Sequence, residues 1–477
     1  MKYTFIGHQS WLVEDGTSKV LLDPLLEDTF GTDNQFGIEV VPPRKVMESA
    51  YKNIDAVILS HEHSDHFHIQ SLNKIDRTTP IYVGILTIEP MVRCIEAMGF
   101  IVYLLKSRDK ISIGTLDFTA YQAHPKTAIW ESRVYQFLFH SNLNDYSIFI
   151  AVDALISKDF ETDVIRGEIT RPDSIMISNN SQIPPKGVLG SLDNASIPEA
   201  ENKARVGALG LRLVKGIIID YSDIVHDLEH IVLCGGGFMK SGDTFGEFMM
   251  SNQGKVAALA TPLFPEKNVQ GAIPGMIFEN NNILADRSDS IVPNTKRENE
   301  LKAKFKAFSK NPEWGLRSMM DDVFDLNECC SIIINAFQIK HIQIMASDFG
   351  RLLVSVGEPN NCFEVCLLSF NQSEERRYNY NWQTNEWSTL QLEKRRPFGI
   401  RAIAADFAQV ATGDIQIWDI AGLAINTWYD PSLGNNPIKY SPMGLIYSIF
   451  GEHFNIEHFE KQCEKQWFKI LDEGGLC

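Results

Sequence analysis

The first part of the chain alternates short apolar runs with turn residues. Three such runs fall within the first 24 residues and are separated by Gly and Asp, which predicts short strands. The run "NIDAVILS", 53–60, is apolar without alternation, as in a strand that is buried on both faces. The stretch 85–98 has helical spacing and ends at Gly99. Strands, a helix and further strands in this order predict helices that cover one or more sheets.

The pattern changes at about residue 291. The stretches 342–358 and 362–370 have the alternation of strands, and 457–474 has the spacing of an amphipathic helix. Nothing there resembles a chemical motif. We therefore predict two domains, 1–290 and 291–477, the second an α+β domain that serves as a substrate wall, a lid or a dimerisation surface.

Composition narrows the class of protein. The 477 residues carry a formal net charge of -17 and a pI of about 5.2, with 44% hydrophobic residues. An acidic globular chain is not expected to bind nucleic acid or anionic membranes broadly. We expect no signal peptide and no membrane span, because neither a leader pattern nor a run of 18 apolar residues is present. Its eight cysteines are scattered. We therefore expect a cytoplasmic protein with reduced thiols.

The stretch "SHEHSDHFH", 60–68, contains four of the 12 histidines. It directly follows the buried run 53–60, so it lies where a strand passes into a loop. Alternate residues of an extended stretch point the same way, which lets His61 and His63 converge on one ion. Neutral imidazole and carboxylate are the ligands of zinc, iron and manganese. The pattern therefore indicates a metal site rather than a solvated His-rich turn.

H-x-H-x-D-H after an apolar strand resembles the metallo-β-lactamase superfamily. The stretches "GHQSWLVEDGTSKVLLDP", "AYQAHPKTAIWESR" and "IFIAVDA" are similar to its ascorbate-6-phosphate lactonase-like branch, over roughly residues 1–285. The resemblance implies an αββα sandwich, an α/β fold of two sheets face to face with helices outside, followed here by the additional C-terminal α+β domain.

The resemblance also implies a dinuclear site with two divalent ions, zinc first and iron or manganese as alternatives. In that arrangement His61, His63 and His124 hold the first ion, Asp65 and His66 the second, and Asp153 bridges the two. Asp65 is also the candidate catalytic proton donor. The resemblance further implies that Asp23 orients the histidine loop through a hydrogen bond. From the residues themselves, His8 either orients a ligand near Asp23 or is a buried structural histidine. Arg133 and Trp130 are candidates to bind substrate, with an ion pair to a surface acid as the alternative for Arg133.

One position departs from the family pattern. The family carries a last histidine at the end of its final core strand, and here that strand reads "EHIVLCGGGF". Cys234 could replace it as a soft ligand that favours zinc. His230 or His226 could serve if the strand is offset. The third alternative is a weakened second site that holds only one ion tightly.

Three functions follow. The first is a metal-dependent hydrolase, whose metal-bound hydroxide attacks an ester, lactone, amide or phosphodiester of a small molecule. The second is a di-iron oxygenase or hydroxylase on the same fold. The third is a non-catalytic metal-binding protein with a degenerate second site. The expected partner is a small-molecule substrate, and a homo-oligomer is compatible with the sequence.

Overall fold

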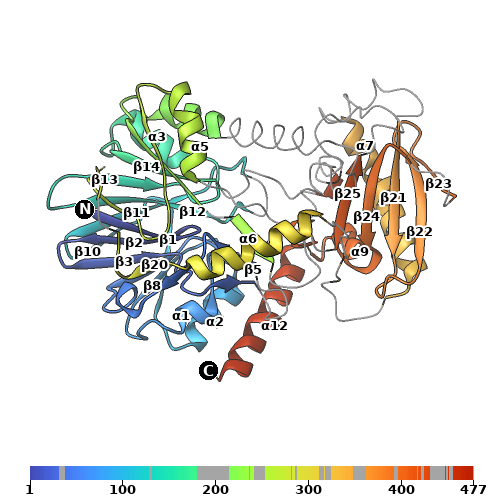
Figure 1. Cartoon of the computed structure of the whole chain (residues 1–477), viewed down its shortest axis with the longest axis horizontal. Helices are drawn as coiled ribbons and strands as arrows, with labels where there is room; N and C mark the ends of the chain where they lie inside the picture. Colours follow the sequence, from blue (N-terminus) through green and yellow to red (C-terminus); the bar gives the residue numbers. More distant parts are fainter. Residues whose placement is uncertain are drawn as a thin grey trace.

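The structure is a computed structural model of the chain (Figure 1). The residues that it describes are 1–31, 38–127, 131–179, 214–235, 237–240, 253–280, 282–284, 287–310, 316, 318, 324–346, 361–391, 396–415, 417–420, 424–429, 446, 449–450 and 455–475.

Two large sheets form the N-terminal part of the described chain. The first has eight strands, in the spatial order β19 (Asn282–Ile283), β18 (Ile277–Glu279), β1 (Lys2–Gly7), β2 (Ser10–Asp15), β3 (Ser18–Leu22), β7 (Ala56–Leu59), β8 (Ile81–Gly84) and β9 (Val102–Leu105). The second has seven, in the order β10 (Lys110–Ile113), β11 (Leu116–Gln122), β12 (Tyr135–Ser141), β13 (Ser147–Ile150), β14 (Ser174–Ser178), β15 (His230–Cys234) and β17 (Asn268–Gly271).

The side-chain alternation of these strands explains why the sheets stack. On β7, Ala56 and Ile58 belong to the core between the two sheets, whereas Val57 belongs to the core on the outer face. On β12, Phe137 lies in the core between the sheets and Leu138 in the outer core of the second sheet. Successive residues of a strand point to opposite faces, so a strand that is apolar at every position must be covered on both.

Helices provide the outer cover of both sheets. The first sheet is covered by α1 (Ile69–Leu72) and α2 (Glu89–Ala97), whose apolar residues share a core with β7 and β8. The second is covered by α3 (Lys158–Arg166), α5 (Gln253–Ala260) and a helical stretch at 214–224. Ser157 caps α3 by accepting from the Phe160 amide, and Gly167 ends it in the left-handed conformation. The fold is therefore the αββα sandwich that the sequence predicts, with additional structure after it.

Shorter elements complete this part. They are β4 (Thr29–Phe30), β5 (Ile38–Val41) and β16 (Gly237–Lys240) in one small sheet, β6 (Arg44–Val46) paired with β20 (Ile291–Pro293), and the short helices η1 (Glu48–Ala50) and η4 (Thr261–Leu263).

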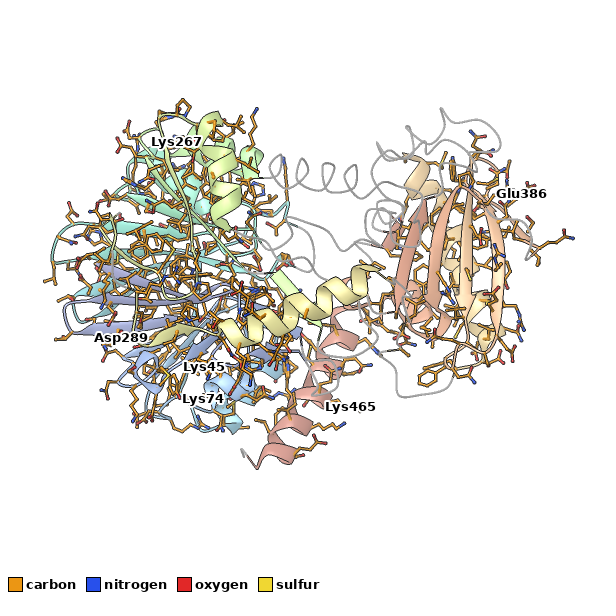
Figure 2. The ribbon with its side chains drawn as sticks, viewed as in Figure 1. Lys45, Lys74, Lys267, Asp289, Glu386 and Lys465 are labelled. Carbon is orange, nitrogen blue, oxygen red and sulfur yellow. The ribbon has the colours of Figure 1, made fainter. Side chains whose placement is uncertain are left out.

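A separate sheet forms the C-terminal part. Its order is β23 (Glu386–Thr389), β22 (Glu375–Asn381), β21 (Cys362–Leu368), β24 (Phe398–Ile403) and β25 (Ile425–Tyr429), with α7 (Leu326–Ala346), α9 (Ala404–Thr412) and α10 (Ile417–Ile420) beside it. It has its own apolar core, shared by α7, β21 and α9. Figure 2 shows Glu386 on this sheet, well away from Lys45 and Lys74 of the sandwich.

The two parts are linked by more than the chain between them. Helix α6 (Thr295–Lys310) extends from the sandwich toward the C-terminal sheet, and α12 (Ile456–Gly474) returns along the sandwich beside α2 (Figure 1). On α12, Cys463, Trp467 and Leu471 are buried in the core that α1 and α2 share. The division at 290 stays a prediction, and β20 and α12, which both follow it, contact the sandwich.

No helix among the described residues combines the length and the apolar character that crossing a bilayer requires.

Candidate metal centre

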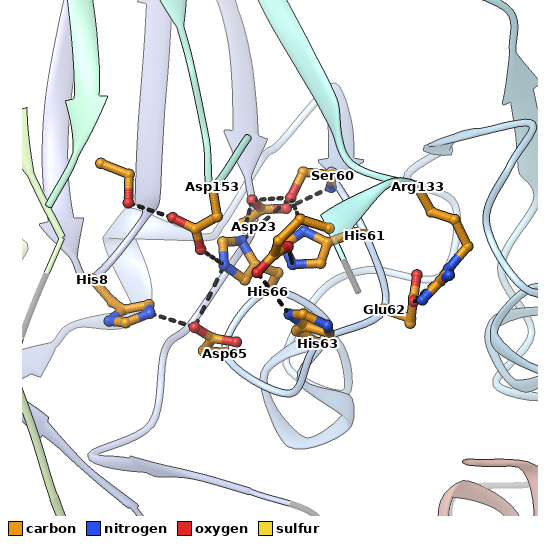
Figure 3. A network of polar contacts seen from close by, with 12 residues as sticks. His8, Asp23, Ser60, His61, Glu62, His63, Asp65, His66, Arg133 and Asp153 are labelled. Carbon is orange, nitrogen blue, oxygen red and sulfur yellow. Dashed lines mark hydrogen bonds and ion pairs between the residues drawn. The ribbon is translucent and has the colours of Figure 1, made fainter. Parts of the chain in front are cut away.

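Functional side chains follow the ends of several strands at one edge of the sandwich. Asp23 follows β3, Ser60 and His61 follow β7, and Asp153 comes three residues after β13. His8 lies in the turn between β1 and β2. Because β3 and β7 run parallel, as do β13 and β14, their carboxyl ends bring these loops together (Figure 3).

The first group of donors contains His61, His63 and Glu131. The distance from His61 Nε2 to Glu131 Oε2 is 3.4 Å, and that from His63 Nδ1 to Glu131 Oε1 is 3.6 Å. The rings of His61 and His63 meet edge to face, with centroids 4.4 Å apart. One ligand atom from each of the three residues lies within 4.8 Å of the others.

The second group is centred on His66. Its Nε2 lies 2.9 Å from Asp153 Oδ2 and 3.5 Å from Asp65 Oδ2. Asp65 Oδ2 is in turn 2.6 Å from His8 Nε2. Two ligand sets result from these contacts, His61 with His66 and Asp153, and His8 with Asp65 and His66. Figure 3 shows His66 between Asp153 and Asp65.

Asp23 and Ser60 orient two of these imidazoles. Asp23 is fully buried and accepts from the Ser60 amide at 2.7 Å and from the Ser60 hydroxyl at 2.7 Å. Its Oδ2 also lies 2.8 Å from His66 Nδ1. Since the Ser60 hydroxyl donates to Asp23, it can accept from His61 Nδ1 at 2.9 Å. With Nδ1 directed at Ser60 in His61 and at Asp23 in His66, the Nε2 atom of each ring faces the other candidate ligands, where it can bind an ion in its unprotonated form.

The backbone at this edge is strained. His8, Asp23 and Val152 have φ values of +57°, +45° and +50°, in the left-handed region. A β-branched residue such as Val152 is rarely found there, and each such residue costs about 1–3 kcal/mol. Three strained residues beside one cluster indicate that the surrounding structure holds the donors in place.

The electrostatics of the cluster favour a bound cation. Burial and the charge of Asp153 raise the pKa of Glu131 well above its usual range. Burial opposes the charged form of His66, but Asp65 and Asp23 raise its pKa well above the ordinary value. Burial and the neighbouring His66 lower the pKa of His61. Glu131 and His66 thus retain protons in the absence of an ion, and a bound metal ion would replace those protons.

An observation on two buried atoms tests whether these residues fit a metal. Among the described residues, His61 Nε2 and Glu131 Oε2 have no hydrogen-bond partner, although they lie only 3.4 Å apart. Buried polar atoms rarely lack a hydrogen-bond partner, and each atom without one lowers the stability of the folded state by about 1–3 kcal/mol. An ion ligated by both would satisfy them. The residues present therefore fit a metal.

Three of the predicted ligands lie apart from these groups. Among the described residues, His124 is in none of the ligand sets, and its Nδ1 accepts from the Lys126 amide at 2.9 Å. Cys234 Sγ contacts Gln9 Oε1 and the Ile177 carbonyl, each at 3.4 Å, and burial raises the thiol pKa. His230 is at the opposite end of β15 from Cys234 and lies near Asn268.

The residues predicted to bind substrate have different outcomes. Arg133 is buried, and its Nε donates to Glu62 Oε1 at 2.7 Å, with a second short bond from Nη2. This pair lies beside the His61–His63 segment, as Figure 3 shows. A role for Arg133 in substrate binding stays a prediction. Trp130 lies outside the described residues.

Sequence reasoning missed Glu131, Ser60 and Glu62. Glu131 lies in "WESR", within the stretch that resembles the family's second metal motif. The resemblance assigned His124, not Glu131, as the metal ligand of that stretch. A carboxylate two residues before Arg133 was the available signal. Ser60 is the polar end of an apolar strand, and only the contact with Asp23 reveals its part.

A family model described as a beta-lactamase superfamily domain matches residues 2–177. No curated protein matches the sequence. Residues 2–177 thus form a beta-lactamase superfamily domain, as the H-x-H-x-D-H motif indicates. The narrower resemblance to the ascorbate-6-phosphate lactonase-like branch stays a prediction.

Solved structures show similarity at low identity. A possible metal-dependent hydrolase from Veillonella parvula DSM 2008 is 14% identical, with a TM-score of 0.40, over 58% of this chain and 98% of that one. An isothiocyanate hydrolase from Delia radicum gut bacteria is 16% identical, with a TM-score of 0.38, over 58% and 98%. CmlA, a diiron beta-hydroxylase from Streptomyces venezuelae, is 15% identical, with a TM-score of 0.32, over 49% and 44%. These likenesses do not distinguish between reactions.

Proposed function

We propose that this beta-lactamase superfamily domain is a two-metal oxygenase that prefers iron and hydroxylates a small organic substrate. The observation that carries the proposal is the place of Glu131, whose two carboxylate oxygens face His61 Nε2 and His63 Nδ1. Two imidazoles and one carboxylate are the donor set typical of non-haem iron oxygenases. The zinc hydrolase that the motif first suggests would have a third imidazole, His124, at this place.

The charge of the donor set supports the same choice. Asp65, Glu131 and Asp153 bring three carboxylates to the two ligand sites. Each carboxylate that replaces a neutral imidazole adds one negative charge, which stabilises a higher oxidation state of the metal. Oxygen donors also suit iron and manganese better than the softer ligands that select zinc. A redox-active pair of ions is therefore favoured over zinc.

The protein's own residues supply orientation and access. Asp23 and Ser60 fix the rings of His66 and His61, so their Nε2 atoms need not reorganise on binding. The side chains of His63, Asp65, Glu131 and Asp153 are 15–26% exposed, whereas His61 and His66 are at most 1% exposed. The cluster thus opens to solvent on the carboxylate side, where a substrate can approach.

Bound iron would supply the redox chemistry: one oxygen atom of O₂ enters a substrate C–H bond and the other leaves as water, with two electrons from an external donor and two protons from solvent. Asp65, which contacts both His8 and His66, is placed to exchange a proton with a group on the open side.

A metal-dependent hydrolase is the second candidate. It is favoured by the family model, because hydrolysis by a metal-bound hydroxide is the chemistry that the resemblance implies. The same ligand groups would then hold zinc, and Asp65 would protonate the leaving group.

The test is metal content by elemental mass spectrometry on protein purified without chelator or added metal, with its visible spectrum and oxygen uptake. We expect two irons per chain and a visible charge-transfer band. Two zincs, no colour and an active esterase or lactonase would overturn the oxygenase and leave the hydrolase.

Variants of the two candidate ligands sharpen the test. Glu131→His should shift the bound metal from iron toward zinc, because it restores a three-imidazole site. His124→Gln is the matched control, since it removes a nearby imidazole that lies outside the ligand groups. If His124→Gln changes the metal and Glu131→His does not, the assignment of Glu131 is wrong.

A further inference from the structure

Among the described residues, no side chain at the end of β15 belongs to the groups of candidate ligand atoms, although the family pattern supplies a histidine there. The thiol of Cys234 contacts Gln9 and the Ile177 carbonyl, and the position after it is Gly235, which has no side chain. His230 pairs in register with Ser174 at the start of β14, while Cys234 pairs with Ser178, which donates to Asp153. His230 lies four residues before Cys234 on β15. At about 3.3 Å per residue, it is about 13 Å from the end of the strand that is nearest to the candidate metal ligands.

His8 reaches the site from the other sheet. It is fully buried, and its Nε2 is 2.6 Å from Asp65 Oδ2. Its ring centroid is 6.0 Å from that of His66. Ligand atoms of His8, Asp65 and His66 all lie within 4.8 Å of one another. An imidazole is therefore present at the second site, although no residue of β15 provides it.

The turn that carries His8 is rigid and strained. Arg44 is fully buried and donates to the carbonyls of Ile6 at 3.2 Å and Leu25 at 2.6 Å. It thus ties the turn before His8 to the segment after Asp23. Gly7 has a φ of +136°, and a Cβ there would lie 2.9 Å from Arg44 Nε. His8 itself has a left-handed backbone conformation, which residues with a side chain rarely adopt. The surrounding contacts hold this conformation, and it directs the ring of His8 toward Asp65.

We propose that His8 is a ligand of the second metal ion, through Nε2, and replaces the histidine that the family carries at the end of its last core strand. The ion would then be held by His8, Asp65, His66 and the shared Asp153. This assignment rests on the two-ion site of the proposed function but not on the reaction. The structure thus completes the second site from the first hairpin of the chain instead of from β15.

The competing role for His8 is a hydrogen bond to Asp65 without metal ligation. His8→Gln separates the two, because the glutamine amide can still donate to Asp65 but is no imidazole. Losing a hydrogen-bonding neighbour typically weakens a metal site by about 10–100-fold. Loss of a metal ligand should weaken binding of the second ion by more than this factor, so that only one ion stays tightly bound.

The experiment titrates apoprotein with Fe²⁺ under anaerobic conditions in the wild type, His8→Gln, Cys234→Ser and His124→Gln. X-ray absorption on the loaded proteins counts imidazole and sulfur neighbours. We expect two ions in the wild type, Cys234→Ser and His124→Gln. In His8→Gln we expect one bound ion. Free imidazole in the buffer should replace the missing ligand and help a second ion to bind.

The assignment is overturned if His8→Gln binds two ions within 100-fold of the wild-type affinity. A sulfur neighbour in the wild type that disappears in Cys234→Ser also overturns it. If the wild type itself binds fewer than two ions, the two-ion proposal fails, and that result is recognised before any variant is compared. Circular dichroism of each apoprotein identifies a variant that does not fold. In that case the X-ray absorption spectrum of the wild type still tests whether Cys234, rather than His8, is the ligand.

Discussion

Buried charges are handled differently in the two parts of the molecule. In the C-terminal sheet, Glu364 on β21 and Arg377 on β22 are both buried and joined by a bond of 2.8 Å from Arg377 Nε. The second oxygen of Glu364 accepts from the Arg396 amide at 2.9 Å. The charge of the Glu364 carboxylate is therefore neutralised within the protein.

At the edge of the sandwich the charges do not balance in the same way. Asp65, Glu131 and Asp153 converge on imidazoles, and these carboxylates are partly open to solvent. Burying a carboxylate is expensive unless it is paired or coordinates a metal. The comparison indicates that the carboxylates at this edge of the sandwich suit a cation from outside, whereas the buried carboxylate of the C-terminal sheet has an arginine as its partner.

The largest expected effect is on the shared ligand. Asp153→Ala should lower activity by about 10⁴-fold or more, or roughly 5 kcal/mol of transition-state stabilisation, because it removes a donor that contacts His66 at 2.9 Å. Activity per folded molecule is measured alongside metal content. Comparable activity in this variant and the wild type would contradict the role of Asp153.

The next largest effect concerns the buried ion pair of Glu364 and Arg377 in the C-terminal sheet. Glu364→Leu should lower the free energy of unfolding by about 3–5 kcal/mol, because it leaves Arg377 buried without its partner. The double variant Glu364→Leu with Arg377→Met should recover much of this loss. Urea denaturation measures the stability, and metal content should stay unchanged. A change in metal content would show that the two parts are coupled through this pair.

Removal of metal should affect only the sandwich. At a metal concentration 100 to 1,000 times the dissociation constant, bound metal stabilises the folded state by about 2.7–4.1 kcal/mol. Hydrogen exchange after chelation should therefore increase around residues 60–66 and 148–153 while β21 and β22 keep their protection. Equal loss of protection in the sandwich and in the C-terminal sheet would contradict the prediction that only the sandwich depends on metal.

The smallest expected effect is on α12, the element of the C-terminal part that reaches the sandwich. Trp467 meets Phe67 edge to face at 4.9 Å, and Phe67 directly follows His66. Phe459, on the same helix, lies 5.7 Å from the Arg133 guanidinium, which is paired with Glu62. Trp467→Ala should therefore weaken metal binding by about 10–100-fold, as expected for a group that positions a ligand.

Leu471→Ala is the matched control for this helix. Leu471 is equally well buried in the same core, so its loss should cost a similar stability without changing metal affinity. Trp467→Phe should restore much of the affinity, because a ring remains against Phe67. If both alanine variants weaken metal binding alike, α12 contributes only stability.

Much of the site could be predicted because its residues are local in sequence. His61, His63, Asp65 and His66 follow one buried strand, and the period of two places the first pair on one side. Asp23 and Asp153 also follow apolar strands, and both contact His66 in the structure. Local periodicity fixes such features, because it depends on backbone geometry alone.

Contacts between distant segments could not be predicted in the same way. Glu131, not His124, meets His61 and His63, and no periodicity of the sequence distinguishes these two residues. The N-terminal turn brings His8 to Asp65, 57 residues later. Helix α12 returns to the sandwich from the other end of the chain.

The sequence by itself determined the buried strands of the sandwich, the αββα class and the position of the metal motif, because burial on both faces of a strand is visible in its residues. It was wrong at 342–346, which it predicted as a strand and which belong to helix α7. Only the tertiary structure decided which carboxylate and which further imidazole join that motif. Donors of a metal site need only meet in space, and the strand ends and turns that bring them together are set by the packing of whole sheets.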